Sequence, residues 1–253
     1  MLVAPPLHVL TMPDRFTSFV HARFARPVLM AVVLAAPLGA GALPAPEADG
    51  AAAAVAGHAT PVAVARLLDD LRVGDVVFIR VTARPFREVA DATGSWTNHV
   101  GVVVDVPGRG LQVAESTVPF ARLTPVADFV ARSDHGRVAV RRLGAPLTPA
   151  QAAAGGAAAA RRLGTRYDTG FDLHSGGQFC SRFVREVLAE ATGETVGEVQ
   201  TFAALLRARP DAPLGFWQAW FFGRIPWQRE TVTPASQLHS PRLATVFDGH
   251  AAP

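Results

Sequence analysis

The chain contains a single cysteine, Cys180, and a helix with one apolar face begins at that residue. From Cys180 onward, apolar side chains recur at the spacing of one helical face. The sequence therefore predicts a helix that carries Cys180 in its first turn, on the buried side, and ends near Gly193. Unpaired N–H groups and the helix dipole favour a thiolate at such a position. The apolar side chains of this face are Phe183, Val184, Val187 and Leu188.

A lone cysteine of this kind has two interpretations. It is either a small buried side chain, which is the commoner case, or a nucleophile activated by a nearby base. Position alone does not decide between them. The remaining residues must supply the base and the group that orients it.

Composition indicates a folded chain with no strong electrostatic partner. The chain has 253 residues, of which 49% are hydrophobic and 18% charged, so it can bury a core and is not disordered as a whole. All 24 basic residues are arginine, and the formal net charge is only +3. A net charge this small does not indicate a protein that binds nucleic acid.

The first residues resemble an export signal. Three arginines precede an apolar run from Val28 to Ala40, and Ala40–Ala42 has the small-residue pattern of a cleavage site. We expect residues 1–42 to be an export signal, 43–57 a linker and 58–253 the folded domain of a periplasmic or secreted protein. Exported proteins mostly pair their cysteines, so an unpaired one favours a functional thiol.

A predicted β-hairpin over residues 99–115 carries a histidine and a glutamate. Its turn is the sequence Pro107–Gly110. With Val106–Gly108 as the loop, His99 lies directly opposite Glu115, about 4.5–5.5 Å away at Cβ. A glutamate there holds the histidine tautomer and favours its protonated form. A slip of one residue would separate the pair, and a surface ion pair of little value is the alternative interpretation.

Other segments predict elements without obvious chemistry. The apolar run Val76–Ile79 predicts a buried strand. An alanine-rich helix is predicted to start at Thr148 and to end at Gly164, and a further helix is predicted over Val199–Arg209. Thr82–Asn98 is polar and carries no predicted element. Whether that segment is a mobile lid stays open.

Five aromatic residues fall within the seven residues of Phe216–Phe222. Such a run is a lipid-interface patch, a substrate platform or simply core, and core is the default. The first option would give weak membrane contact through Trp217 and Trp220. The eight histidines show no HExxH spacing and the lone cysteine forms no CxxC pair, so we expect no metal and no cofactor.

Several short segments, which follow one another in the same order as in that family, resemble the YebB/YiiX group of permuted papain-like (NlpC-type) cysteine hydrolases. The resemblance covers roughly residues 64–248. The histidine strand precedes the cysteine helix, the reverse of the papain order. Two features depart from the family pattern: Asn98, where a smaller residue is expected before the histidine, and the long 82–98 segment. Both affect the expected shape of the opening through which substrate enters. The matching segments are Leu71–Phe78, Asn98–Gly101, Val113–Ser116, Tyr167–Asp168, Phe179–Val184 and Val232–Pro234 with Leu238.

The resemblance implies an α+β, circularly permuted papain-like fold, with an antiparallel sheet or partial barrel packed against the cysteine helix. It implies Cys180 as nucleophile, His99 as base, Glu115 as orienting group and Tyr167 near the oxyanion of the substrate. The expected function is hydrolysis of a peptide or cell-envelope amide, such as a peptidoglycan fragment. A lipid acyl hydrolase or acyltransferase and a non-catalytic envelope-binding module are the alternatives.

Overall fold

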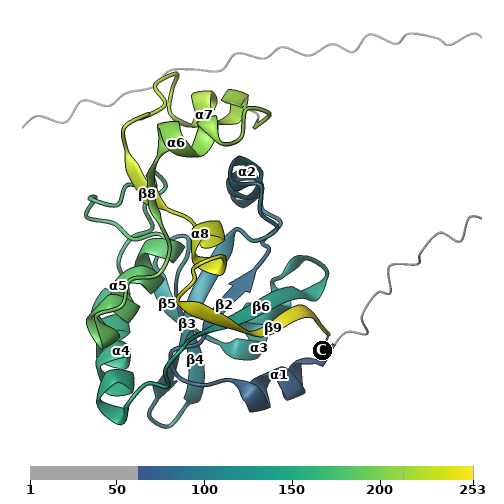
Figure 1. Cartoon of the computed structure of the whole chain (residues 1–253), viewed down its shortest axis with the longest axis vertical. Helices are drawn as coiled ribbons and strands as arrows, with labels where there is room; N and C mark the ends of the chain where they lie inside the picture. Colours follow the sequence, from purple (N-terminus) through teal and green to yellow (C-terminus); the bar gives the residue numbers. More distant parts are fainter. Residues whose placement is uncertain (1–61, 213, 253) are drawn as a thin grey trace, which may run out of the picture. The chain divides into compact units, whose positions relative to one another are not determined.

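The computed structural model describes residues 62–212 and 214–252 (Figure 1). The expected export signal, residues 1–42, and the expected linker, residues 43–57, lie outside the described residues. The strands are β1 (Val62–Ala63), β2 (Val76–Ile79), β3 (His99–Val106), β4 (Gly110–Ser116), β5 (Ala121–Pro125), β6 (Arg137–Leu143), β7 (Val199–Thr201), β8 (Glu230–Val232) and β9 (Leu243–Ala252).

The main sheet of the described residues is open and almost wholly antiparallel. Its strand order is β1-β9-β6-β2-β3-β4-β5, and only the short β1–β9 pair is parallel. Strands β7 and β8 form a separate antiparallel pair. Because β1 and β5 are unpaired edges, the sheet does not close into a barrel, and of the two expected arrangements the antiparallel sheet is the one observed.

Helices cover both faces of the main sheet. Alternate residues of β2 and β3 point to opposite faces, with Phe78 in the core beneath α4 and α5 and Val77 in the core beneath α1 and α3. Both cores are apolar and closed to solvent. The helices are α1 (Val64–Asp70), α2 (Arg84–Thr93), α3 (Val126–Ala131), a 3₁₀ turn (Asp134–Gly136), α4 (Pro149–Arg162), α5 (Cys180–Thr192), α6 (Phe202–Arg207), α7 (Leu214–Trp220) and α8 (Pro234–Leu238).

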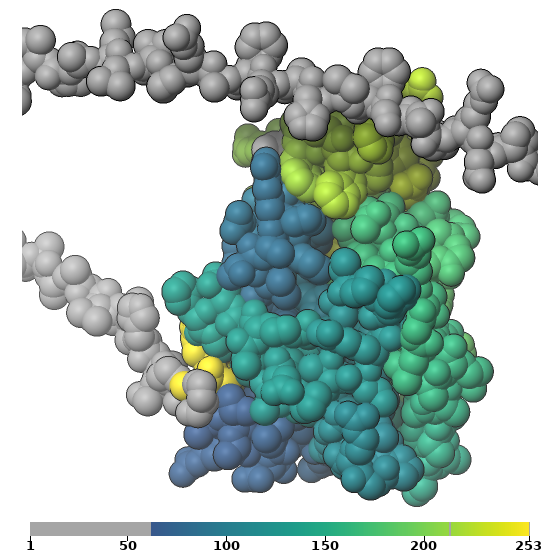
Figure 2. Space-filling model, turned by 180° about the vertical axis from the view of Figure 1, so that it is seen from behind, coloured from purple at the N-terminus to yellow at the C-terminus, as the bar shows by residue number. Residues whose placement is uncertain are grey.

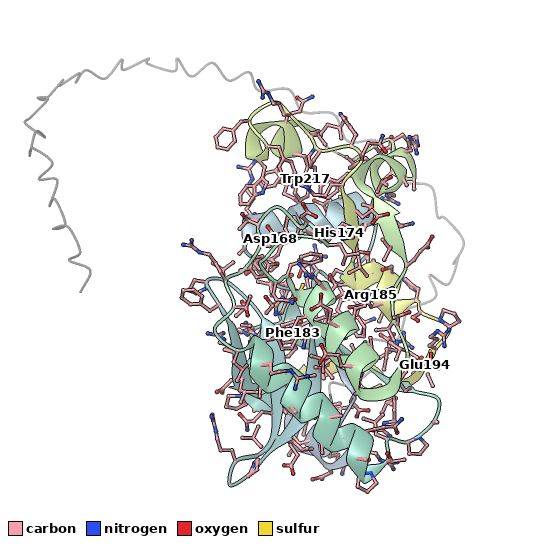
Figure 3. The ribbon with its side chains drawn as sticks, turned by 90° about the vertical axis from the view of Figure 1, so that its left-hand side faces the viewer. Asp168, His174, Phe183, Arg185, Glu194 and Trp217 are labelled. Carbon is pink, nitrogen blue, oxygen red and sulfur yellow. The ribbon has the colours of Figure 1, made fainter. Side chains whose placement is uncertain are left out.

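The predicted cysteine helix is confirmed as α5. It begins at Cys180 and ends at Gly193, which takes the left-handed conformation with φ 78°. Its buried face carries Phe183, labelled in Figure 3, and packs on the sheet beside α4. Thr148 caps α4 through a reciprocal pair of hydrogen bonds with Gln151, as a Thr-Pro helix start predicts.

The hairpin forms, but its register differs from the expected one. Val106 pairs with Gly110 and Asp105 with Leu111, so the loop lies one residue later in the chain than expected. Moving the loop by one residue displaces the strand pairing by two. Because strand side chains alternate with period two, His99 and Glu115 stay on the same face as diagonal neighbours.

The segment between β2 and β3 contains a helix that the sequence reading missed. α2 has proline in its first turn and ends at Gly94, in the left-handed conformation. It lies next to α6 and α7, at the end of the domain drawn above the sheet in Figure 1. The expected helix at Val199–Arg209 is instead a short strand, β7, followed by α6, because Val199–Thr201 pairs with β8.

No helix of the described residues is long and apolar enough to span a bilayer.

Gly101 is a packing requirement of this fold, since a Cβ there would collide with the side chain of Val113 and press on the ring of Phe129. We therefore expect Gly101→Ala to lower the free energy of unfolding by about 1–3 kcal/mol. Gly156→Ala is the matched control, because nothing lies within 4 Å of its Cβ position and alanine favours a helix. Urea unfolding of both variants checks the opposite signs; equal effects would contradict this packing.

Candidate active site

Cys180 lies in the first turn of α5 and is held there by contacts to the hairpin. Ser116, the last residue of β4, donates a hydrogen bond of 3.0 Å from Oγ to the carbonyl of Gln178. The same carbonyl accepts the backbone N–H of Asp168 at 2.7 Å. These bonds fix the chain two residues before the cysteine. The helix start is therefore anchored to the strand that carries Glu115.

The thiol is buried but lines a pocket. Cys180 is 3% exposed and belongs to the apolar core beneath α5. It also forms part of the wall of a pocket that it shares with Tyr167 and Asn98. The sulfur is thus shielded from bulk water without being sealed away from a ligand that enters this pocket.

His99 and Glu115 make a short buried hydrogen bond. The distance from His99 Nε2 to Glu115 Oε2 is 2.6 Å, and both side chains are almost fully buried. The imidazole ring lies between two phenyl rings, with centroid distances of 5.7 Å to Phe86 and to Phe129. Among the described residues, Nδ1 of His99 has no hydrogen-bond partner of good geometry. This nitrogen is therefore not occupied by another side chain of the described residues.

Glu115 is fixed by more than the histidine. Thr124 donates a hydrogen bond of 2.6 Å to Oε1, and Arg132 contacts both carboxylate oxygens at 2.8 Å. The guanidinium of Arg132 also lies 4.9 Å above the Phe129 ring, which packs against His99. These neighbours, which the sequence reading did not single out, hold the carboxylate ionised and aimed at the imidazole.

The electrostatics of the pair follow from burial and these contacts. Burial, the largest influence, lowers the pKa of His99, but the neighbouring Cys180 and the hydrogen-bonded, charged Glu115 outweigh it and raise this pKa to about 9. Burial raises the pKa of Glu115, but His99 and Arg132 hold that pKa well below its usual range. His99 is therefore an imidazolium at neutral pH, facing an ionised glutamate.

Tyr167 lies on the approach to the cysteine. Burial, followed by the charge and hydrogen bond of Cys180, raises the pKa of the Tyr167 phenol well above its ordinary value. The phenol therefore stays protonated and can donate a hydrogen bond. The structure thus brings together all four residues singled out in the sequence, from β3, β4, the segment before α5 and α5 itself.

The pocket beside Cys180 is narrow and almost entirely apolar. It holds about 580 Å³ of empty space, its open mouth included. Part of the pocket wall comes from α2, the helix that was not predicted. The helical spacing of Phe86, Val89 and Ala90 is the sequence signal that could have revealed this helix. Asn98 joins the lining, and its amide pairs with the backbone of Val81, extending the β2–β3 ladder. The apolar lining residues are Phe86, Val89, Ala92, Phe171, Phe179, Phe202, Leu205, Leu206, Trp217, Val232 and Pro234.

The order of the strands and the cysteine helix, together with this site, defines a permuted papain-like protein. Residues 70–247 match the model of the permuted papain-like amidase enzymes, YaeF/YiiX, C92 family, and the chain belongs to that family. This membership supports a cysteine hydrolase in general terms.

Two similar proteins come from Escherichia coli. The protein named uncharacterized protein YiiX, of strain K12, is 28% identical over 174 residues, which is 68% of this chain and 84% of that protein. A crystal structure of a protein called metalloprotein yiiX, from strain O157:H7, has a TM-score of 0.63 and 26% identity; the match covers 71% of this chain and 98% of that chain.

The E. coli protein of that crystal structure is described as a metalloprotein. In this chain, over the ranges 62–212 and 214–252, no three His, Cys, Asp or Glu side chains are grouped so that they could hold a metal ion. The described residues therefore do not fit a metal centre, and Nε2 of His99 is already bound to Glu115.

The raised pKa of His99 depends on its two partners, and this gives a test. We expect Glu115→Gln to lower the pKa of His99 from about 9 by about 1–3 pH units, because the amide no longer stabilises the imidazolium while burial still opposes it. NMR titration of the imidazole measures this value. Glu194→Gln is the matched control, since Glu194 pairs with Arg242 elsewhere. A His99 pKa unchanged by Glu115→Gln would contradict the coupling.

Proposed function

We propose that the protein is a cysteine hydrolase of amide bonds in which Cys180 attacks, His99 transfers the proton and Glu115 orients the imidazole. The observation that carries the proposal is the buried 2.6 Å hydrogen bond of His99 to an ionised Glu115, beside the only thiol of the chain. A third group that orients the base is what nucleophilic catalysis requires. Arg132 and Thr124 act as positioning residues for the carboxylate.

The first half of the reaction forms an acyl-enzyme. The reaction starts from an imidazolium–thiolate pair, in which the proton of Cys180 already lies on His99, and the sulfur attacks the carbonyl carbon of the substrate. Unpaired N–H groups at the start of α5 and the Tyr167 phenol stabilise the oxyanion. The C–N bond then breaks as the imidazolium gives its proton to the leaving amine. A thioester on Cys180 remains.

The second half releases the acid. Neutral His99 takes a proton from water, the resulting hydroxide attacks the thioester carbonyl, and the C–S bond breaks. The sulfur leaves as a thiolate beside the imidazolium, so the starting ion pair is restored. Glu115 stays ionised throughout, which its contacts with Arg132 favour.

A lipid acyl hydrolase or acyltransferase is the second candidate, and the pocket favours it. Most of its lining residues are aliphatic or aromatic, and Cys180 is among the residues that line it. A fatty acyl chain would bury its methylene groups there, at about 0.8 kcal/mol for each. In this case the attacked carbonyl belongs to an acyl ester or N-acyl amide, and the same four residues serve.

We also propose that the protein works in the cell envelope after export. The arginines and apolar run of residues 1–42 support export, and an unpaired cysteine suits that compartment when it is shielded and used. Peptides, peptidoglycan fragments and acyl lipids are the substrates to test there. A non-catalytic binding module would need none of the proton-transfer geometry around His99.

Alkylation of the single thiol tests the proposed pairing. We expect iodoacetamide to react with Cys180 faster than with a free thiol near neutral pH, and His99→Ala to slow this reaction about 100-fold, the scale of a lost general base. Intact-mass spectrometry follows the rate, because the chain has one cysteine. His174→Ala, at an exposed histidine, should leave the rate unchanged. A slow reaction in the unaltered protein would remove the basis of the proposal.

The length of the acyl group separates the two candidate substrates. If the pocket holds an acyl chain, kcat/KM should be higher for nitrophenyl esters of medium-chain fatty acids than for nitrophenyl acetate. Leu205→Trp, which fills the pocket, should cut kcat/KM for the long esters by about tenfold or more while sparing the acetate. Leu214→Trp, at an exposed position of α7, is the control. A preference for acetyl or peptide amides in the unaltered protein would leave the amide hydrolase as the function.

A further inference from the structure

The turn after α7 exposes an aromatic side chain almost completely. Phe222 is 94% exposed, far more than the other large apolar residues described as exposed. It lies in the segment between α7 and the buried Ile225. Figure 2 shows the yellow-green segment that holds α6 and α7 at one end of the domain, beside the blue segment that holds α2. Phe222 does not join the aromatic cluster that its neighbours form.

The two tryptophans named as one option for membrane contact both make contacts within the domain. Trp217 is 5% exposed and lines the apolar pocket; Figure 3 shows it at the same end of the domain, apart from Phe183. Trp220 donates a hydrogen bond of 2.9 Å from Nε1 to the carbonyl of Thr169 and stacks on Phe216. Phe222 is therefore the better candidate in this aromatic run for contact with a membrane surface.

The backbone of Phe222 is in a costly conformation. Its φ is 50°, in the left-handed region that bulky side chains rarely adopt. Strain of this kind is kept where the surrounding structure or a function demands it. The side chain has no buried contact to offset the strain. An exposed, strained phenylalanine is thus explained better by a ligand than by the stability of the fold.

The charges around this turn are mostly positive. From Phe202 to Arg229 the described residues include four arginines and a single carboxylate, Asp211. Arg224, two residues after Phe222, is exposed and has no carboxylate partner within the described part of the chain, and the same holds for Arg207. Arg84 of α2 lies 5.5 Å above the ring of Phe216 at the same end, but its charge is partly offset by an ion pair with Glu88 at 3.4 Å.

We propose that this end of the domain docks on the surface of an anionic lipid bilayer, with Phe222 inserted among the lipids and Arg224 and Arg207 on the headgroups. One projecting ring flanked by arginines is too small for a stable protein interface. It has the composition of an interfacial anchor, in which an aromatic ring enters the headgroup layer and cations contact anionic lipids. Docking is weak and reversible, because one ring buries little surface.

The same helix connects the docking turn to the pocket. α7 carries Trp217, which lines the pocket beside Cys180, and ends two residues before Phe222. A bilayer held at this turn would lie next to the wall of that pocket. Docking does not require catalysis, so it is tested without turnover.

A label at the turn tests insertion directly. In the full chain with Cys180→Ser, Phe222→Cys provides the only thiol, which is coupled to an environment-sensitive nitrobenzoxadiazole dye. We expect a blue shift and a rise in emission with phosphatidylglycerol-containing vesicles, reduced by salt and by Arg224→Glu. The matched control carries the dye through Arg109→Cys, at the exposed β3–β4 turn, and should not respond.

Three results would overturn the proposal: no response at position 222, the same response at position 109, or an equal response to neutral phosphatidylcholine vesicles. Phe222→Gly provides a second measurement. Because glycine accepts the left-handed conformation, we expect its Tm to equal or exceed that of the unaltered protein, while vesicle binding falls about tenfold. A lower Tm would show that Phe222 serves the fold, and would contradict a docking role.

Discussion

The buried hydrogen bond between His99 and Glu115 imposes the main constraint on the site. Two ionisable side chains that are closed to water are stable only when each satisfies the other and the remaining acceptors are filled. Thr124 and Arg132 fill them, and two phenyl rings confine the imidazole. The pair is therefore rigid, and one ring nitrogen stays available for a neighbouring group.

The fold brings Cys180 to the same site by independent means. The hairpin carries the histidine and the glutamate, whereas the cysteine arrives on a helix that begins about 65 residues after the hairpin and packs on the sheet. The hydrogen bond from Ser116 to the Gln178 carbonyl joins the two parts at the helix start. In this arrangement the permuted chain order has no chemical consequence, because the site depends on which groups meet and not on which comes first.

Local patterns in the sequence were sufficient for the central elements. The apolar face of α5, the Thr-Pro start of α4 and the run Val76–Ile79 are each determined by neighbouring residues, and each was predicted correctly. The hairpin register depends on loop geometry and was displaced by two residues. The pairing of His99 with Glu115 survived, since the side-chain period of a strand is also two.

Features that depend on tertiary contacts were not predictable in this way. α2 was overlooked because its apolar face, Phe86, Val89 and Ala90, is short, and it is buried only where the helix packs against α6 and α7. Arg132 and Thr124 gave no signal, since α3 and β5 meet Glu115 only in the folded chain. For the same reason, the aromatic run could not show which of its rings, Trp217 or Phe222, faces solvent.

The central claim is that Cys180 carries the acyl group during turnover, with His99 as its base. Acid quenching of a steady-state reaction with an activated acyl ester, followed by intact-mass spectrometry, measures this most directly. We predict one added acyl group, located on the peptide that contains Cys180, absent in Cys180→Ser and strongly reduced in His99→Ala. Turnover without any adduct, or undiminished turnover in Cys180→Ser, would contradict the account.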